Sequence, residues 1–133
     1  MTRCFADTHY FLAIINPDDV AHDRAVEYSK KTDLALVSTG WVFTELANSM
    51  SRSRDRSLFT TILDDFTADP SSVMLPPDER LFRLGVVLYQ NRPDKDWSLT
   101  DCISFVVMEE QGLGTALTAD RHFEQAGFVA LLK

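Results

Sequence analysis

The stretch SLTDCISF, Ser98 to Phe105, combines a helix start with a carboxylate that has two possible roles. Ser98 is followed three residues later by Asp101, just ahead of apolar side chains, which is typical of a capping box at a helix N-terminus. The spacing predicts a helix over residues 98–111, ended by Gly112, where a left-handed backbone costs little. Asp101 could simply cap this helix, or it could carry out chemistry at the helix mouth. Which role applies depends on the other residues that the fold brings close to Asp101.

The composition indicates one globular domain. The chain has 133 residues, of which 45% are hydrophobic, and this is enough for a sizeable core, so we expect a single domain over residues 1–133. There is no apolar run of membrane-spanning length and no signal-peptide order at the start, which favours a cytoplasmic protein. Cys4 and Cys102 form no metal-binding spacing and are expected to be reduced thiols in apolar surroundings.

The net charge of −7 argues against a protein that coats nucleic acids indiscriminately. It does not exclude a nuclease whose carboxylates surround metal ions, because the charge of the cations reverses the local field.

Short β-type runs alternate with stretches of helical spacing along the whole chain. Strands are predicted at residues 4–6, 34–37, 72–75, 115–117 and 128–131. Helices are predicted at residues 16–31, 41–52, 58–66, 81–88 and 98–111. Asn16 and Pro17 form the start signal of the first of these helices. Short strands joined through helices predict an α/β fold with a mainly parallel sheet that is covered on both faces.

Four acids are predicted to meet at the carboxyl edge of this sheet, where ligands bind in such folds. Asp7 follows the first strand and Asp120 follows the fourth. Glu45 lies on the helix after the second strand, and Asp101 begins the helix that leads into the fourth. Taken singly, Asp7 could end a strand in a turn, Asp120 could cap a short helix and Glu45 could be a solvated helix acid. Their shared position favours a common site.

Clustered carboxylates repel one another, so a cation is expected among them. Ligands that are all oxygen suit Mg²⁺, with Mn²⁺ as the alternative. This arrangement is used for metal-assisted hydrolysis of phosphodiester bonds, in which the metal activates a water. We therefore predict Asp7, Glu45, Asp101 and Asp120 as catalytic residues.

Several other polar residues are candidates for supporting roles, each with a purely structural alternative. Thr8, Ser98 and Thr118 could orient a water or a carboxylate, or could simply suit turns. In SRSRDRS, residues 51–57, the side chains of Arg52, Arg54 and Arg56 could hold RNA phosphates, improve solubility or bind an acidic partner. Asp96 is a candidate additional acid, but a loop acid beside Lys95 is expected to be solvated. The spacing of the three histidines, His9, His22 and His122, does not indicate metal ligation.

Four sequence blocks together resemble the motifs of the PIN-domain nucleases. They are FADTHYFLA with Asp7, FTELANS with Glu45, SLTDCISF with Asp101 and ALTADRHF with Asp120. Within that superfamily the chain is most similar to the VapC-type ribonuclease toxins of toxin-antitoxin pairs. The resemblance covers nearly the whole chain, and it weakens between residues 54 and 96.

The resemblance implies a three-layer α/β/α sandwich and Mg²⁺-dependent endonucleolytic cleavage of RNA. Asp7 and Asp101 would be the principal metal ligands, and Glu45 and Asp120 would complete the cluster. It also implies a homodimer and a cognate antitoxin that lies across the active-site groove. The alternatives are a solitary PIN-domain nuclease in RNA processing and a PIN-like module that binds RNA or protein without catalysis. A phosphoacceptor domain is disfavoured because only the terminal Lys133 follows the last predicted strand.

Overall fold

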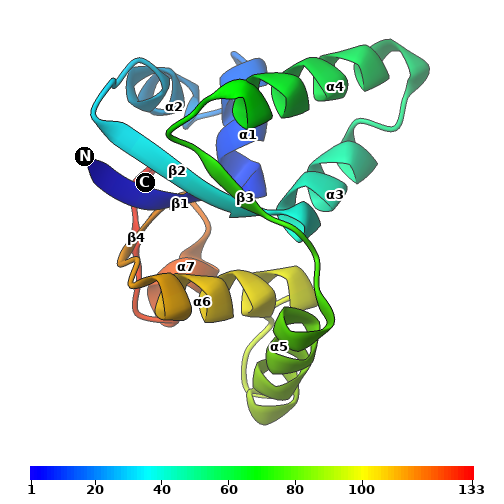
Figure 1. Cartoon of the computed structure of the whole chain (residues 1–133), viewed down its shortest axis with the longest axis vertical. Helices are drawn as coiled ribbons and strands as arrows, with labels where there is room; N and C mark the ends of the chain where they lie inside the picture. The colour runs from blue at the N-terminus through cyan, green and yellow to red at the C-terminus, as the bar shows by residue number, and fades with distance from the viewer.

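The computed structural model describes residues 1–133, which form five strands and seven helices (Figure 1). In chain order these are β1 (Thr2–Ala6), α1 (Thr8–Ile15), α2 (His22–Ser29), β2 (Leu34–Thr39), α3 (Gly40–Ser49), α4 (Ser53–Ala68), β3 (Val73–Leu75), α5 (Glu79–Asn91), α6 (Leu99–Gln111), β4 (Thr115–Leu117), α7 (Arg121–Gln125) and β5 (Val129–Ala130). No helix is both long and apolar enough to cross a membrane.

The strands form one sheet in the order β3-β2-β1-β4-β5, and every neighbouring pair is parallel. All five predicted strands are therefore confirmed, as is the parallel sheet. Helices α1, α2 and α4 lie on one side of the sheet, while α6 and α7 lie on the other with α5 packed against α6, which makes a three-layer α/β/α sandwich (Figure 1). Since crossover connections are right-handed, chain travel from β1 toward β3 places helices on one face, and the return through β4 places them on the other.

The central strand β1 carries the core because both of its faces are covered. Cys4, Phe5 and Ala6 are fully buried, and burial raises the pKa of the Cys4 thiol to about 12. The free cysteines therefore lie in apolar surroundings, as predicted.

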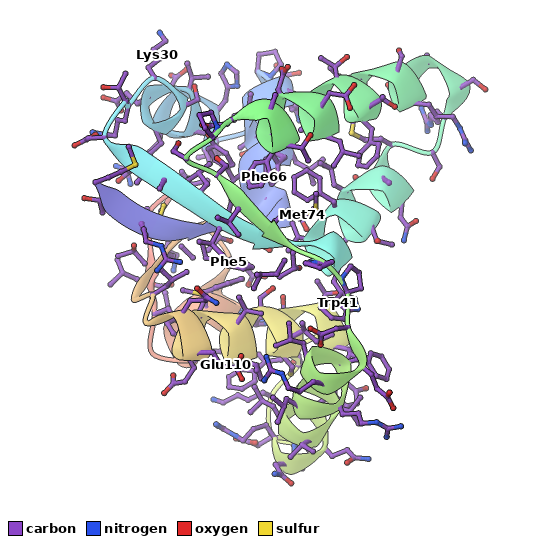
Figure 2. The ribbon with its side chains drawn as sticks, viewed as in Figure 1. Phe5, Lys30, Trp41, Phe66, Met74 and Glu110 are labelled. Carbon is purple, nitrogen blue, oxygen red and sulfur yellow. The ribbon has the colours of Figure 1, made fainter.

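Aromatic side chains fill the space on each side of the sheet. Phe11, Phe43 and Phe66 pack together with ring centroids 5.0–5.9 Å apart under α4. On the opposite side, Phe123 stacks edge-on against Phe105 at 4.9 Å and lies 6.3 Å from Phe5. Figure 2 shows Phe66 and Phe5 on opposite sides of the sheet. Such burial of large apolar rings is the main force that holds the helices to the sheet.

The predicted helix start at Asn16 is wrong. Asn16 instead ends α1, and α2 begins only at His22. The Asn16 side chain accepts a hydrogen bond from the backbone N–H of Asp18, and Asp19 accepts one from Ala21, so both side chains close turns. The local hydrogen bonding of an N-cap and of such a turn is the same, and this explains the error.

The helix predicted over residues 41–52 ends at Ser49, and α4 begins at Ser53. The arginine-rich stretch therefore connects two helices and forms the first turn of the second. In contrast, the predicted helix at Ser98 is confirmed in detail. Both hydrogen bonds of the capping box between Ser98 and Asp101 are present, and Gly112 has a φ of 67°.

Candidate active site

The four predicted acids lie where β1, β2 and β4 end and where α6 begins. Asp7 directly follows β1, and Asp120 lies three residues beyond β4. Glu45 is on α3, the helix that continues from β2. Because α6 runs back from the carboxyl edge toward the start of β4, its first-turn residue Asp101 also lies at this edge.

Asp7 is buried, with only 6% of its surface exposed. Its Oδ2 accepts a hydrogen bond of 2.9 Å from the hydroxyl of Thr118. Burial raises the pKa of the Asp7 carboxyl to about 7, and the negative charges of Asp101 and Glu45 add to this rise, while the Thr118 hydrogen bond opposes it. The carboxylate therefore loses much of its hydration without gaining a positive partner from the protein.

Glu45 is held by the first residue of α1. The hydroxyl of Thr8 donates a 2.6 Å hydrogen bond to Glu45 Oε1. Thr8 is buried directly beside Asp7, whereas Glu45 is exposed. The hydroxyl thus fixes a mobile glutamate side chain against the end of β1.

Asp101 caps α6, which is one of the two roles that the sequence allowed. Its Oδ2 accepts a 3.1 Å hydrogen bond from the backbone N–H of Ser98, and the Ser98 hydroxyl accepts one of 2.9 Å from the N–H of Asp101. Burial raises the pKa of Asp101, although this cap hydrogen bond and His122 counteract the rise. The cap therefore orients a partly buried carboxylate toward the other acids.

Asp120 caps α7, since its Oδ1 accepts a 2.9 Å hydrogen bond from the backbone N–H of His122. The backbone N–H of Asp120 donates in turn to the hydroxyl of Thr118, at 3.0 Å. The same Thr118 hydroxyl donates to Asp7. One buried threonine thus joins the two acids that follow β1 and β4.

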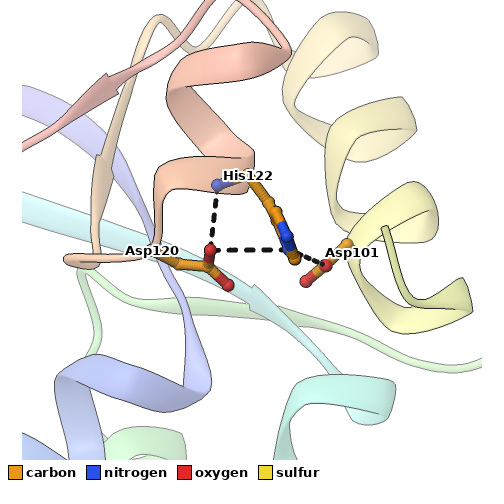
Figure 3. Close-up of side chains that lie close together, drawn as sticks. All are labelled: Asp101, Asp120 and His122. Carbon is orange, nitrogen blue, oxygen red and sulfur yellow. Dashed lines mark hydrogen bonds and ion pairs between the residues drawn. The ribbon is translucent and has the colours of Figure 1, made fainter. Parts of the chain in front are cut away.

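His122 lies between Asp101 and Asp120 (Figure 3). Its Nδ1 is 3.1 Å from Asp101 Oδ2 and 3.5 Å from Asp120 Oδ1. One donor atom from each of these three residues lies within 4.8 Å of the others, an arrangement that could hold a metal ion. His122 was not predicted at this site, because the spacing of the three histidines along the sequence does not indicate metal ligation. The overlooked signal was an imidazole two residues after an acid at a helix start.

The acids and His122 line one open cleft of about 490 Å³. Two further acids, Asp19 and Asp96, also line it, and His9 pairs with Asp19 at 3.8 Å. Asp96 is exposed, as expected, but it belongs to the wall of the cleft. No lysine or arginine lines this cleft. Six carboxylates with no lysine or arginine among them make a site that attracts cations.

The remaining predicted residues are not brought to the cleft. Arg52, Arg54 and Arg56 do not line it, and the Nε of Arg56 donates instead to the backbone oxygen of Ser51. His22 contacts the backbone oxygen of Ala13 at 2.7 Å and is therefore structural. Two more apolar hollows, of about 360 Å³ between α1, α2 and α4 and about 550 Å³ along α5 and α6, do not collect carboxylates from the strand ends.

The donor set fits a divalent cation. Carboxylate oxygens are the usual ligands of Mg²⁺ and Mn²⁺, and a nearby positive charge would favour the ionised form of Asp7, whose pKa burial raises to about 7. Asp7, Asp101 and Asp120 could supply oxygen ligands, and His122 could supply a nitrogen ligand.

The fold and the cleft together define an α/β/α protein with a carboxylate-lined site at the carboxyl edge of a parallel sheet. The chain belongs to the PIN domain family, whose model matches residues 4–129. This membership supports a nuclease and confirms the resemblance noted in the sequence. A search of curated proteins found no match.

Three solved structures share the fold of this chain. VapC20 from Mycobacterium tuberculosis, described as a toxin that cleaves the Sarcin-Ricin loop, aligns with a TM-score of 0.83 and 21% identity over 95% of this chain and 96% of that chain. VapBC2 from Rickettsia felis aligns with a TM-score of 0.68 and 13% identity over 97% of each chain. FitAcB from Neisseria gonorrhoeae aligns with a TM-score of 0.65 and 17% identity over 96% of this chain and 94% of that chain.

Proposed function

We propose that this protein is a metal-dependent endoribonuclease that acts as the toxin of a toxin-antitoxin pair in the cytoplasm. The observation that carries the proposal is the convergence of Asp7, Glu45, Asp101 and Asp120 on one cleft that no lysine or arginine lines. Such a cleft repels a phosphate backbone unless cations are bound, so the acids are best explained as cation ligands. Membership of the PIN family supports a nuclease.

A bound divalent cation, Mg²⁺ or Mn²⁺, would supply an activated water and would neutralise charge on the scissile phosphate. The protein side chains hold and orient the ligands. Thr118 aligns Asp7 with Asp120, and Thr8 aligns Glu45. Ser98 fixes Asp101 through the helix cap. The rigid ends of strands and helices keep these carboxylates in place before the substrate arrives.

The proposed substrate is RNA, and the proposed partners are a cognate antitoxin and a second copy of the chain. The structural neighbour VapC20 is described as a toxin, which supports an antitoxin partner. Arg52, Arg54 and Arg56 lie away from the acidic cleft, so contact with RNA through them requires a substrate that extends beyond the cleft.

The test is cleavage of total RNA by purified protein in Mg²⁺ and in Mn²⁺, with EDTA as the metal-free control. Asp7→Asn and Asp101→Asn should each abolish cleavage, as well as the growth arrest that follows induction in cells. Asp64→Asn is the matched control, because it removes the same charge from an exposed position on α4 and should leave cleavage unchanged. Full activity of both site variants, or activity in EDTA, contradicts the proposal.

Toxin function has its own test. Co-expression with the protein encoded by the adjacent reading frame should abolish the growth arrest and yield a stable complex. If no neighbouring protein neutralises an active enzyme, the solitary nuclease is the correct reading.

A further inference from the structure

His122 is the one cleft residue that contacts two of the four acids and also offers a nitrogen atom as a ligand. Its Nδ1 faces Asp101 Oδ2 at 3.1 Å and Asp120 Oδ1 at 3.5 Å (Figure 3). The side chain is held in this place from two directions. Its backbone N–H is bound by Asp120, and its side chain is only 18% exposed, with that of Asp101 at 13%.

We propose that His122 is a metal ligand through Nδ1, and that it makes this site selective for first-row divalent transition-metal ions over Mg²⁺. The inference rests on the proposed function and deepens it, because it concerns the identity of the metal. Asp101 and Asp120 supply the oxygen ligands of the same ion, so the set is two carboxylates and one imidazole.

The spacing of the three groups fits ligation. Donor atoms about 2.1 Å from one ion lie about 3.0 Å apart at a right angle and about 3.4 Å apart at a tetrahedral angle. The two distances from Nδ1, 3.1 and 3.5 Å, fall at these values. Without a cation, an Nδ1–H donated to Asp101 keeps the same atoms together, so a metal that replaces this hydrogen needs little rearrangement.

The chemistry of the donors gives the selectivity. Mg²⁺ binds oxygen ligands and retains its waters, and it gains little from imidazole. Transition-metal ions bind imidazole well, and their affinity for a site with nitrogen and oxygen donors rises from Mn²⁺ toward the later members of the series. A site made only of carboxylates would discriminate less, because it offers every ion the same hard oxygen donors.

The experiment is calorimetric titration of the full-length protein with MgCl₂, MnCl₂ and CoCl₂. His122→Asn is the key variant, because its side-chain amide can still donate a hydrogen bond to Asp101 while the imidazole lone pair is lost. We expect this variant to bind Co²⁺ and Mn²⁺ about tenfold more weakly, with Mg²⁺ affinity changed by less than about threefold. His9→Asn, which removes an imidazole from the same cleft, should change none of the three affinities.

The outcomes separate this inference from the function itself. Equal Mg²⁺ and Co²⁺ affinities in the wild type, or Co²⁺ affinity unchanged in His122→Asn, overturns ligation by His122 but leaves a metal-dependent nuclease intact. Absence of any divalent-ion binding overturns the metal-dependent function as well. A visible absorption spectrum of the Co²⁺-loaded wild type that is altered in His122→Asn and retained in His9→Asn supports ligation through a readout independent of activity.

Discussion

The hydroxyl of Thr118 donates a 2.9 Å hydrogen bond to Oδ2 of Asp7, which lies 111 residues earlier in the chain. Both residues are buried at the carboxyl edge of the sheet, where β1 and β4 are neighbours. This bond is the only direct contact between the Asp7 carboxylate and a protein donor side chain. Asp7 is therefore a carboxylate held at an energetic cost, and this cost can be measured.

Asp7→Asn should stabilise the metal-free protein, and more so as the pH rises. The unfolded chain loses the Asp7 proton near its ordinary pKa of 3.8, and the native protein loses it near 7. Between these values the native state binds more protons, so its free energy of unfolding falls as the pH increases. A shift of about three pKa units lowers the free energy of unfolding of the wild type by up to about 4 kcal/mol, and the asparagine variant does not lose this free energy.

Urea unfolding of the wild type and of Asp7→Asn at pH 4 to 8 in EDTA measures this difference. The advantage of the variant should grow through that range and level off above pH 7, whereas Asp64→Asn on the surface should show no such trend. Saturating Mg²⁺ or Mn²⁺ should reduce the advantage, because the cation binds the native wild type. A constant difference between the two proteins at every pH would mean that Asp7 is not the titrating group.

Thr118→Val should destabilise the protein by about 1–3 kcal/mol, because a buried carboxylate loses its hydrogen bond and the N–H of Asp120 loses its acceptor. Thr118→Ser retains the hydroxyl and should restore most of this loss. Metal affinity is the second measurement, since Thr118 positions two of the proposed ligands. We expect weaker Mg²⁺ binding by the valine variant only. Equal metal affinity in all three proteins would limit Thr118 to a structural role.

Gly85→Ala should destabilise the contact between α5 and α6. A Cβ atom at Gly85 would lie 2.3 Å from Cγ1 of Ile103, which is buried on α6. The expected loss in the free energy of unfolding is about 2 kcal/mol, despite the better helix propensity of alanine. Gly114→Ala is the control, because no atom lies within 4 Å of its added methyl group. Thermal unfolding should separate the two variants clearly.

Two buried serines should respond in opposite directions to alanine. The Oγ of Ser104 on α6 is buried without a hydrogen-bond partner, so Ser104→Ala should raise the free energy of unfolding by about 1 kcal/mol. The Oγ of Ser38 donates to the backbone oxygen of Ala6 at 2.8 Å, so Ser38→Ala should lower it by about 1 kcal/mol. A loss of stability in Ser104→Ala would show that its hydroxyl is satisfied in solution.

Local patterns were enough to predict most of the fold. Each strand was recognised from a short apolar run, and the α6 cap from Ser98 and Asp101. These signals are local, because a helix cap and an apolar pattern each involve residues that are only a few positions apart in the sequence. Asn16 shows where this reasoning fails, because its side chain makes the same kind of local hydrogen bond in a turn as at a helix start.

The sequence by itself determined the five strands, the parallel sheet and the placement of four acids at strand and helix ends, because these follow from short local patterns. Only the tertiary structure decided the burial of Asp7, the insertion of His122 between Asp101 and Asp120, and the separation of the arginines from the cleft. Burial and charge interactions join segments as distant as Asp7 and Thr118, and no local pattern encodes that proximity.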